Sequence, residues 1–94
     1  ILTSISHPTG TDRIAEVCES IAADVYVNVQ GDEPLIRPET ISACALPLLE
    51  DNSIPMGSAF SECLQAEWDN PAAVKVVTDL SGFALYFSRY AVPF

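Results

Sequence analysis

Apolar residues in the first third of the chain change their spacing from one segment to the next. In "VYVNV", residues 25–29, they recur at every second position, which is typical of a β-strand, and residues 1–5 also predict a strand. Between these segments the apolar residues lie three or four positions apart, at Ile14, Val17, Cys18 and Ile21. This spacing predicts an amphipathic helix over residues 11–22, with Thr11 as its N-cap.

The pattern then predicts a second helix, a further strand and a hairpin. The helix begins at Pro38, since proline is favoured at the first helical position, and Pro47 predicts a kink or an early end. Its apolar stripe is formed by Ile41, Cys44, Ala45 and Leu48. Residues 55–63 predict a strand, and residues 74–89 alternate on both sides of Asp79–Gly82, which indicates a β-hairpin.

This order of elements is typical of an α/β fold with a mainly parallel sheet and antiparallel additions. In such folds, ligands bind beyond the carboxyl ends of the strands, where helices begin. Two polar loops follow predicted strands here: "SHPTGTDR", residues 6–13, and "QGDEP", residues 30–34. If the two strands are neighbours in a parallel sheet, both loops line one edge of it.

Composition narrows the class of protein. The chain has 94 residues, of which 49% are apolar and only 18% charged, and this is rich in apolar residues for an isolated domain of that size. We therefore expect residues 1–94 to be an internal segment of one larger domain. The net charge of −9 argues against a nucleic-acid-binding surface. Three cysteines without a C-x-x-C pair, no signal peptide and no membrane span predict a soluble, cytoplasmic protein.

The first loop combines hydroxyl groups, a histidine and Arg13 with the free N–H groups of a helix start, which together form a cradle for a polar or anionic ligand. The alternative is an ordinary capped helix, with Arg13 solvated or paired to Glu16. His7 has no second histidine or cysteine nearby, so local hydrogen bonds are expected for it rather than metal ligation.

The second loop places two carboxylates where an apolar strand ends. Gly31 allows the chain to turn and a ligand to approach, and Asp32 would present hard oxygens suited to Mg²⁺ shared with nucleotide phosphates. Gln30 offers a donor and an acceptor to a sugar or base edge, and Glu33 would bind a ligand or only cap the turn. The alternative interpretation is an acidic turn without a ligand.

Two cations lie on the predicted hairpin. Lys75 alternates with Val74 and Val76, so it faces either solvent or a cleft. Arg89 ends a strand, where a guanidinium can hold a carboxylate in a bidentate pair; the alternative is a salt bridge to one of the many acids. The cysteines have no evident base beside them, which argues against a cysteine nucleophile.

Four blocks of the sequence resemble the 3-deoxy-manno-octulosonate (Kdo) cytidylyltransferases in order and spacing: "TGTDRIAEV", "VYVNVQGDEPLI", "NPAAVKVV" and "GFALYFSR". The resemblance implies a Rossmann-like nucleotidyltransferase fold, a homodimer, and transfer of a cytidylyl group from CTP to the acid sugar Kdo with Mg²⁺. The products would be pyrophosphate and CMP-Kdo, the activated sugar for lipopolysaccharide.

The same resemblance assigns roles to individual residues. Thr9, Gly10, Thr11, Asp12 and Arg13 would contact the cytidine end of CTP, and Thr9 stands where serine is commoner in the family. Gln30 would touch the nucleotide or the sugar, and Asp32 would be the catalytic residue that holds Mg²⁺ at the α-phosphate. Arg89 is the first candidate for the contact with Kdo, and Lys75 is the second. An upstream phosphate loop and a downstream metal-binding aspartate of the family have no counterpart in these residues, so the isolated chain is expected to be inactive.

Two alternatives remain open at this point. A CMP-sialic acid synthetase-like cytidylyltransferase shares the chemistry but matches the four blocks less well. A non-catalytic interaction segment would make Asp32 a turn residue and Arg13 a solvated helix charge.

Overall fold

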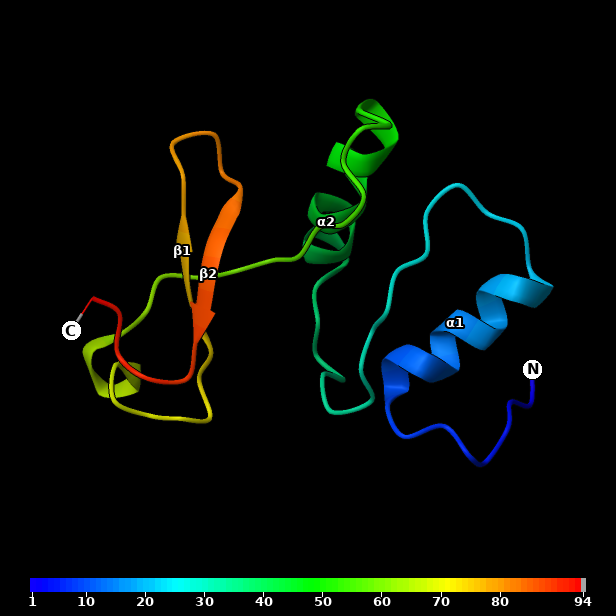
Figure 1. Cartoon of the computed structure of the whole chain (residues 1–94), viewed down its shortest axis with the longest axis horizontal. Coiled ribbons are helices and arrows are strands. Elements are labelled where there is room, and N and C mark those ends of the chain that lie inside the picture. The colour runs from blue at the N-terminus through cyan, green and yellow to red at the C-terminus, as the bar shows by residue number, and fades with distance from the viewer. Residues whose placement is uncertain (94) are drawn as a thin grey trace. The chain divides into compact units, whose positions relative to one another are not determined.

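The computed structural model describes residues 1–93, and the chain divides into two compact units, Ile1–Ala59 and Phe60–Phe94 (Figure 1). The first unit contains helices α1 (Gly10–Ser20) and α2 (Pro38–Glu50). The second unit contains the short 3₁₀ helix η1 (Gln65–Glu67) and strands β1 (Lys75–Thr78) and β2 (Ala84–Ser88). Both predicted helices and the predicted hairpin are therefore present.

Helix α1 confirms the predicted helix but not its predicted cap. Thr9, not Thr11, is the N-cap, since its backbone is extended (φ −137°, ψ 163°) and its Oγ1 accepts a hydrogen bond from the Asp12 N–H at 3.2 Å. Thr11 is already inside the helix, two residues after Thr9, so its hydroxyl lies too far along to cap the first turn. The helix ends at Ser20, where the N–H of Ile21 donates to the carbonyl of Val17 at 2.9 Å.

Helix α2 begins at Pro38, as predicted, and runs through Pro47 to Glu50. The early end predicted at Pro47 is therefore wrong. A proline removes one backbone donor, but hydrogen bonding resumes after it, and the Asp51 N–H donates to the Pro47 carbonyl at 3.0 Å. The predicted stripe is confirmed as the half-buried side of the helix: Ile41, Cys44, Ala45 and Leu48. Gly57 packs against it, and a Cβ there would lie 3.0 Å from Leu48.

Three predicted strands do not form among the described residues. Residues 1–5, 25–29 and 55–63 lack a hydrogen-bonded partner strand within residues 1–93, and alternation of side chains cannot by itself make a strand. Residues 25–29 are instead tied to the end of α1 through the Tyr26 hydroxyl, which accepts from the Ala23 N–H at 3.1 Å and donates to the carbonyl of Ile21. The predicted parallel pairing is thus not present in this part of the chain.

Strands β1 and β2 form the predicted antiparallel hairpin. Lys75 pairs with Ser88 and Val77 with Tyr86, and a bulge follows Val77. The turn is held by Asp79, whose Oδ1 accepts the N–H groups of Ser81 and Phe83 at 2.8 and 2.9 Å. Gly82 has a φ of 89°, the left-handed conformation that favours glycine.

Apolar side chains of residues 1–93 are exposed to an unusual degree. No apolar side chain in this range is fully buried, and Leu35, Met56 and Tyr90 are 91%, 81% and 84% exposed. The one buried side chain of this range is Lys75, which is 7% exposed. No helix within residues 1–93 is long and apolar enough to cross a membrane.

Candidate functional site

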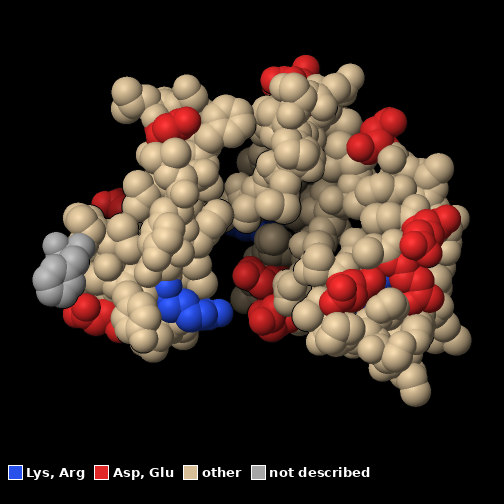
Figure 2. All heavy atoms as spheres, viewed as in Figure 1, with Lys and Arg blue, Asp and Glu red and all other residues tan. Residues whose placement is uncertain are grey.

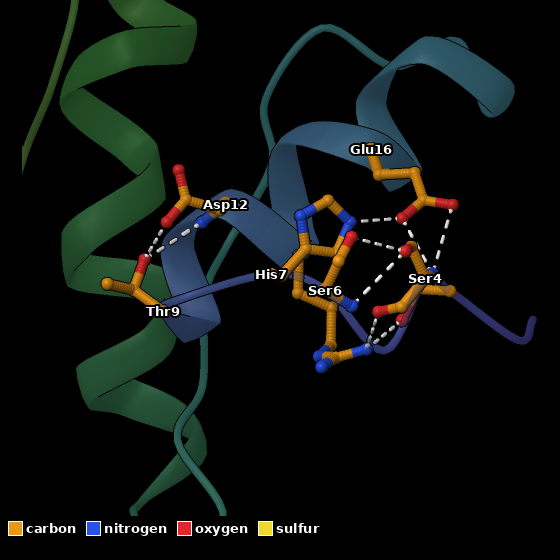
Figure 3. Close-up of polar contacts among 8 residues, drawn as sticks. Ser4, Ser6, His7, Thr9, Asp12 and Glu16 are labelled. Carbon is orange, nitrogen blue, oxygen red and sulfur yellow. Dashed lines mark hydrogen bonds and ion pairs between the residues drawn. The ribbon is translucent and has the colours of Figure 1, made fainter.

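The loop before α1 is organised by short polar contacts (Figure 3). Thr9 caps the helix and its hydroxyl also pairs with the Asp12 carboxylate. The guanidinium of Arg13 uses Nη1 to donate to the Ser4 carbonyl at 2.9 Å and to the hydroxyl of Thr3. Nε and Nη2 of Arg13 make no hydrogen bond to another residue of 1–93, so this half-buried side chain retains donors for an anionic ligand.

Glu16 is the centre of a second set of contacts in this loop. Its Oε2 and Oε1 accept the Ser4 N–H at 3.0 and 3.4 Å, and Oε2 also pairs with His7 Nε2. The hydrogen bonds from His7 and Ser4 hold the pKa of Glu16 below its ordinary value of 4.5, and the charge of Arg13 acts in the same direction. The local hydrogen bonding predicted for His7 is confirmed, whereas the alternative pairing of Arg13 with Glu16 does not occur.

The sequence patterns do not single out Glu16 as an organising residue, although its position contains a signal. Glu16 lies seven residues, or two helical turns, after the N-cap Thr9 and so lies on the same face of α1. A carboxylate at this position faces back along the entering loop, where a histidine and backbone donors are within reach.

The N-cap assignment makes a testable prediction for the complete protein. Thr9→Ala should lower the free energy of unfolding by about 1 kcal/mol, because the Asp12 N–H loses its acceptor. Thr11→Ala, two positions further along the same helix, should change it by less than about 0.5 kcal/mol. The measurement is the midpoint of urea unfolding, and equal losses for the two variants would show that Thr9 is not the cap.

The second loop consists of two consecutive turns. The Glu33 N–H donates to the Gln30 carbonyl at 3.1 Å, and the Ile36 N–H donates to the Glu33 carbonyl at 3.2 Å. Asp32 occupies the tip of the first turn, is exposed, and has no hydrogen-bond partner for its carboxylate among residues 1–93. Gly31 turns without a positive φ, and a Cβ placed there would meet open space, so the backbone is accessible.

A pocket of about 440 Å³ lies between the second loop, α2 and residues 58–59. Gln30, Glu33, Arg37 and Thr40 supply its polar groups, and Val29 and Ile36 are among its apolar walls. The pocket thus includes Gln30 of the predicted site residues. The pocket is not lined by Asp32, Thr9, Gly10, Thr11 or Arg13. No hydrogen bond among residues 1–93 joins the two loops.

Lys75 and Arg89 lie together at the base of the hairpin. The Lys75 ammonium donates to the carbonyls of Asn70, Ala73 and Arg89 at 2.6, 2.9 and 2.9 Å. All three of its donors are therefore used inside the protein. The substrate contact suggested for Lys75 stays a prediction, and this geometry counts against a direct one.

The Arg89 side chain is exposed, and its guanidinium is anchored at one nitrogen. Its Nη1 donates to the Pro71 carbonyl at 2.8 Å, and no carboxylate of residues 1–93 pairs with it. The alternative of a salt bridge is thus not observed, and the remaining guanidinium donors point to no other partner in this range.

Acidic side chains dominate the charge of the described surface. On the face shown in Figure 2 acidic side chains occur on both units, and basic side chains occupy little area. No cluster of three histidine, cysteine or carboxylate side chains occurs in residues 1–93, so this range contains no ready-made protein cage for a metal. Cys18, Cys44 and Cys63 are free thiols.

Comparison with known proteins places these residues in context. A family model described as "Cytidylyltransferase" matches residues 1–94. The chain is 54% identical to the 3-deoxy-manno-octulosonate cytidylyltransferase of Koribacter versatilis over 93 residues, covering 99% of this chain and 35% of that protein. The protein of the same name from Syntrophotalea carbinolica is 54% identical, and the match covers 98% of this chain and 37% of that protein. The one from Geobacter sulfurreducens is 51% identical, and the match covers 99% of this chain and 38% of that protein.

A solved structure gives the same relationship in three dimensions. The chain matches the structure of CMP:2-keto-3-deoxy-manno-octonic acid synthetase complexed with CTP with a TM-score of 0.86 and 39% identity. The match covers 100% of this chain and 39% of that one. The chain thus spans between a third and two fifths of the length of these relatives, and the predicted α/β nucleotidyltransferase fold is confirmed as a partial one.

Proposed function

The chain belongs to the cytidylyltransferase family, and from this we propose that the complete protein transfers the cytidylyl group of CTP to Kdo. The observation that carries the proposal is its 54% identity to 3-deoxy-manno-octulosonate cytidylyltransferases over almost all of its residues. The structural match to a synthetase complexed with CTP supports the same substrate pair. The products are CMP-Kdo and pyrophosphate, a step of lipopolysaccharide biosynthesis, and we further propose that the enzyme is a cytoplasmic homodimer.

The first loop is proposed to bind the nucleotide. Thr9, Gly10 and Thr11 bring hydroxyl and backbone groups to the start of α1, and the helix N-terminus favours an anionic ligand. Arg13 brings the donors that it does not use on Thr3 and Ser4. In the second loop, Gln30 faces the pocket and is proposed to contact the nucleotide or the sugar.

Asp32 is proposed to hold Mg²⁺. An exposed carboxylate without a hydrogen-bond partner in residues 1–93 fits this ion, which keeps several waters and takes only one or two carboxylates from a protein when phosphates supply other ligands. Bound Mg²⁺ would neutralise charge that develops at the α-phosphate. The residues of this chain then orient the reactants for in-line attack of the sugar's anomeric hydroxyl on the α-phosphorus, with pyrophosphate leaving.

Arg89 is proposed to bind the carboxylate of Kdo. Its side chain is exposed and is anchored at one nitrogen by the Pro71 carbonyl, which leaves other donors of the planar guanidinium for a paired contact. Lys75 is proposed to support Kdo binding through its hydrogen bond to the Arg89 carbonyl, which fixes the backbone of Arg89.

An assay of the complete protein tests the proposal. With CTP and Mg²⁺, we expect release of pyrophosphate when Kdo is supplied and little release with sialic acid; the reverse preference would identify a CMP-sialic acid synthetase-like enzyme. The isolated 94 residues should show no turnover above background. A non-catalytic protein would show no activity, and CTP with Mg²⁺ would not raise its melting temperature.

A further inference from the structure

The segment that enters α1 has little apolar packing to define its conformation. Ser4, Ser6 and Thr9 are exposed, and His7 is half-buried with 21% of its side chain accessible. Where few apolar contacts are made, polar contacts decide which conformation a segment adopts. The contacts of this segment converge on Glu16 and Arg13 of α1 (Figure 3).

Glu16 fixes the segment at two separate points. One is the Ser4 N–H, which lies 3.0 Å from Oε2 and 3.4 Å from Oε1, and the other is His7 Nε2. We call Ser4, His7 and Glu16 the Glu16 clamp. Arg13 holds the same residue through a separate contact, by donating from Nη1 to the Ser4 carbonyl at 2.9 Å.

The clamp adjoins the residues proposed to bind CTP but includes none of them. The nucleotide block Thr9–Arg13 follows His7 directly, and its own conformation is set by the Thr9 cap. Two contacts with the second turn of α1, at Ser4 and at His7, limit the positions that the entering segment can take relative to the helix. The clamp therefore restricts the position of the hydroxyl and guanidinium groups before any ligand arrives.

We infer that Glu16 is a positioning residue for the nucleotide, which acts through His7 and Ser4 to preorganise the loop Thr9–Arg13 for CTP. This inference rests on the proposed function, because it takes CTP as the ligand of that loop. The ionised form of Glu16 is the one that accepts both donors, in agreement with the lowered pKa of this carboxyl. Preorganisation of this kind lowers the cost of ordering the loop when the ligand binds.

The test compares Glu16 with Glu19, an exposed carboxylate of the same helix. In the complete protein, Glu16→Ala should raise the Kd and the KM for CTP roughly tenfold, because the loop loses its fixed position. kcat should change by less than about threefold, since no group at the reacting atoms is removed, and the KM for Kdo should stay the same. Glu19→Ala should leave all four quantities at the wild-type values.

Variants of His7 provide an independent measurement. His7→Gln keeps a side-chain N–H for the Glu16 carboxylate, so it should retain CTP affinity better than His7→Ala. In the double variant His7→Ala and Glu16→Ala, the increase in the Kd for CTP should be smaller than the product of the increases in the two single variants, because both residues belong to the Glu16 clamp. Isothermal titration calorimetry with CTP alone gives each Kd.

Each result decides the inference. A wild-type CTP affinity in Glu16→Ala and His7→Ala would overturn it, and so would a lower melting temperature of these variants with no change in Kd, or an equal loss in Glu19→Ala. A failure of the proposed function has a different signature: the wild-type protein would bind CTP without forming CMP-Kdo, and the comparison of Kd values would still decide the role of Glu16.

Discussion

Asparagine in place of Asp32 is expected to lower kcat of the complete enzyme by about 10³-fold or more. The substitution removes one anionic oxygen from a side chain that has no other partner in residues 1–93, so the fold loses nothing at this exposed turn. The substitution removes the ligand proposed for Mg²⁺. A bound metal ion stabilises transition-state charge by several kcal/mol, and losing that stabilisation corresponds to a fall in rate of this size. The Mg²⁺ concentration needed for half-maximal activity should rise in parallel.

Asp24→Asn is the matched control for Asp32. Asp24 is also an exposed acid of the first unit, and it precedes the apolar segment that Asp32 follows. We expect wild-type kcat and Mg²⁺ dependence for this control. A wild-type kcat and Mg²⁺ dependence in Asp32→Asn itself would exclude the metal-binding role and favour the acidic-turn interpretation.

Replacement of Lys75 by methionine is expected to lower the free energy of unfolding of the complete protein by about 3 kcal/mol or more. Three backbone carbonyls lose a charged donor at once, and a buried polar group left without a partner costs about 1–3 kcal/mol. Because these carbonyls belong to Asn70, Ala73 and Arg89, the loop before β1 would lose one of its links to the end of β2. Urea unfolding followed by circular dichroism measures the effect.

Arg37→Met serves as the control for Lys75. The Arg37 side chain is 81% exposed and its nearest carboxylate, on Glu39, lies 3.9 Å away, so the change in stability should stay below about 0.5 kcal/mol. If Lys75→Met instead kept wild-type stability and only raised the KM for Kdo, the direct substrate contact would be the correct role of Lys75.

The elements that the sequence predicted correctly are those whose hydrogen bonds are local. The helices and the hairpin each contain their own partners, and residues such as Pro38 and Gly82 mark their starts and turns. The three predicted strands differ, because strand formation depends on a partner that the pattern of one segment cannot specify. The period of two in residues 25–29 describes side chains and contains no information on what pairs with the backbone.

The candidate site also has features that the sequence predicts and features that it does not. The types of residue in the two loops, and the polar character of their ends, could be inferred from the sequence. The choice between Thr9 and Thr11 as cap could not, because both are threonines followed by residues suited to a helix start. The roles of Glu16 and Lys75 depend on which carbonyl, amide or imidazole lies within about 3 Å of a flexible side chain. That information arises only from the folded loop.

The contrast between the hairpin and residues 25–29 has a consequence for the order of events during synthesis. The hairpin closes over the short turn at Asp79–Phe83 and can form as soon as β2 leaves the ribosome, since loops of this size close in well under a millisecond. Residues 25–29 have no partner strand among the 93 residues described. Any strand pairing of this apolar stretch is therefore either with residues distant in the sequence or with another molecule. Distant pairing is slow and pairing between molecules leads to aggregates, so this stretch is one at which a nascent chain benefits from protection by a chaperone.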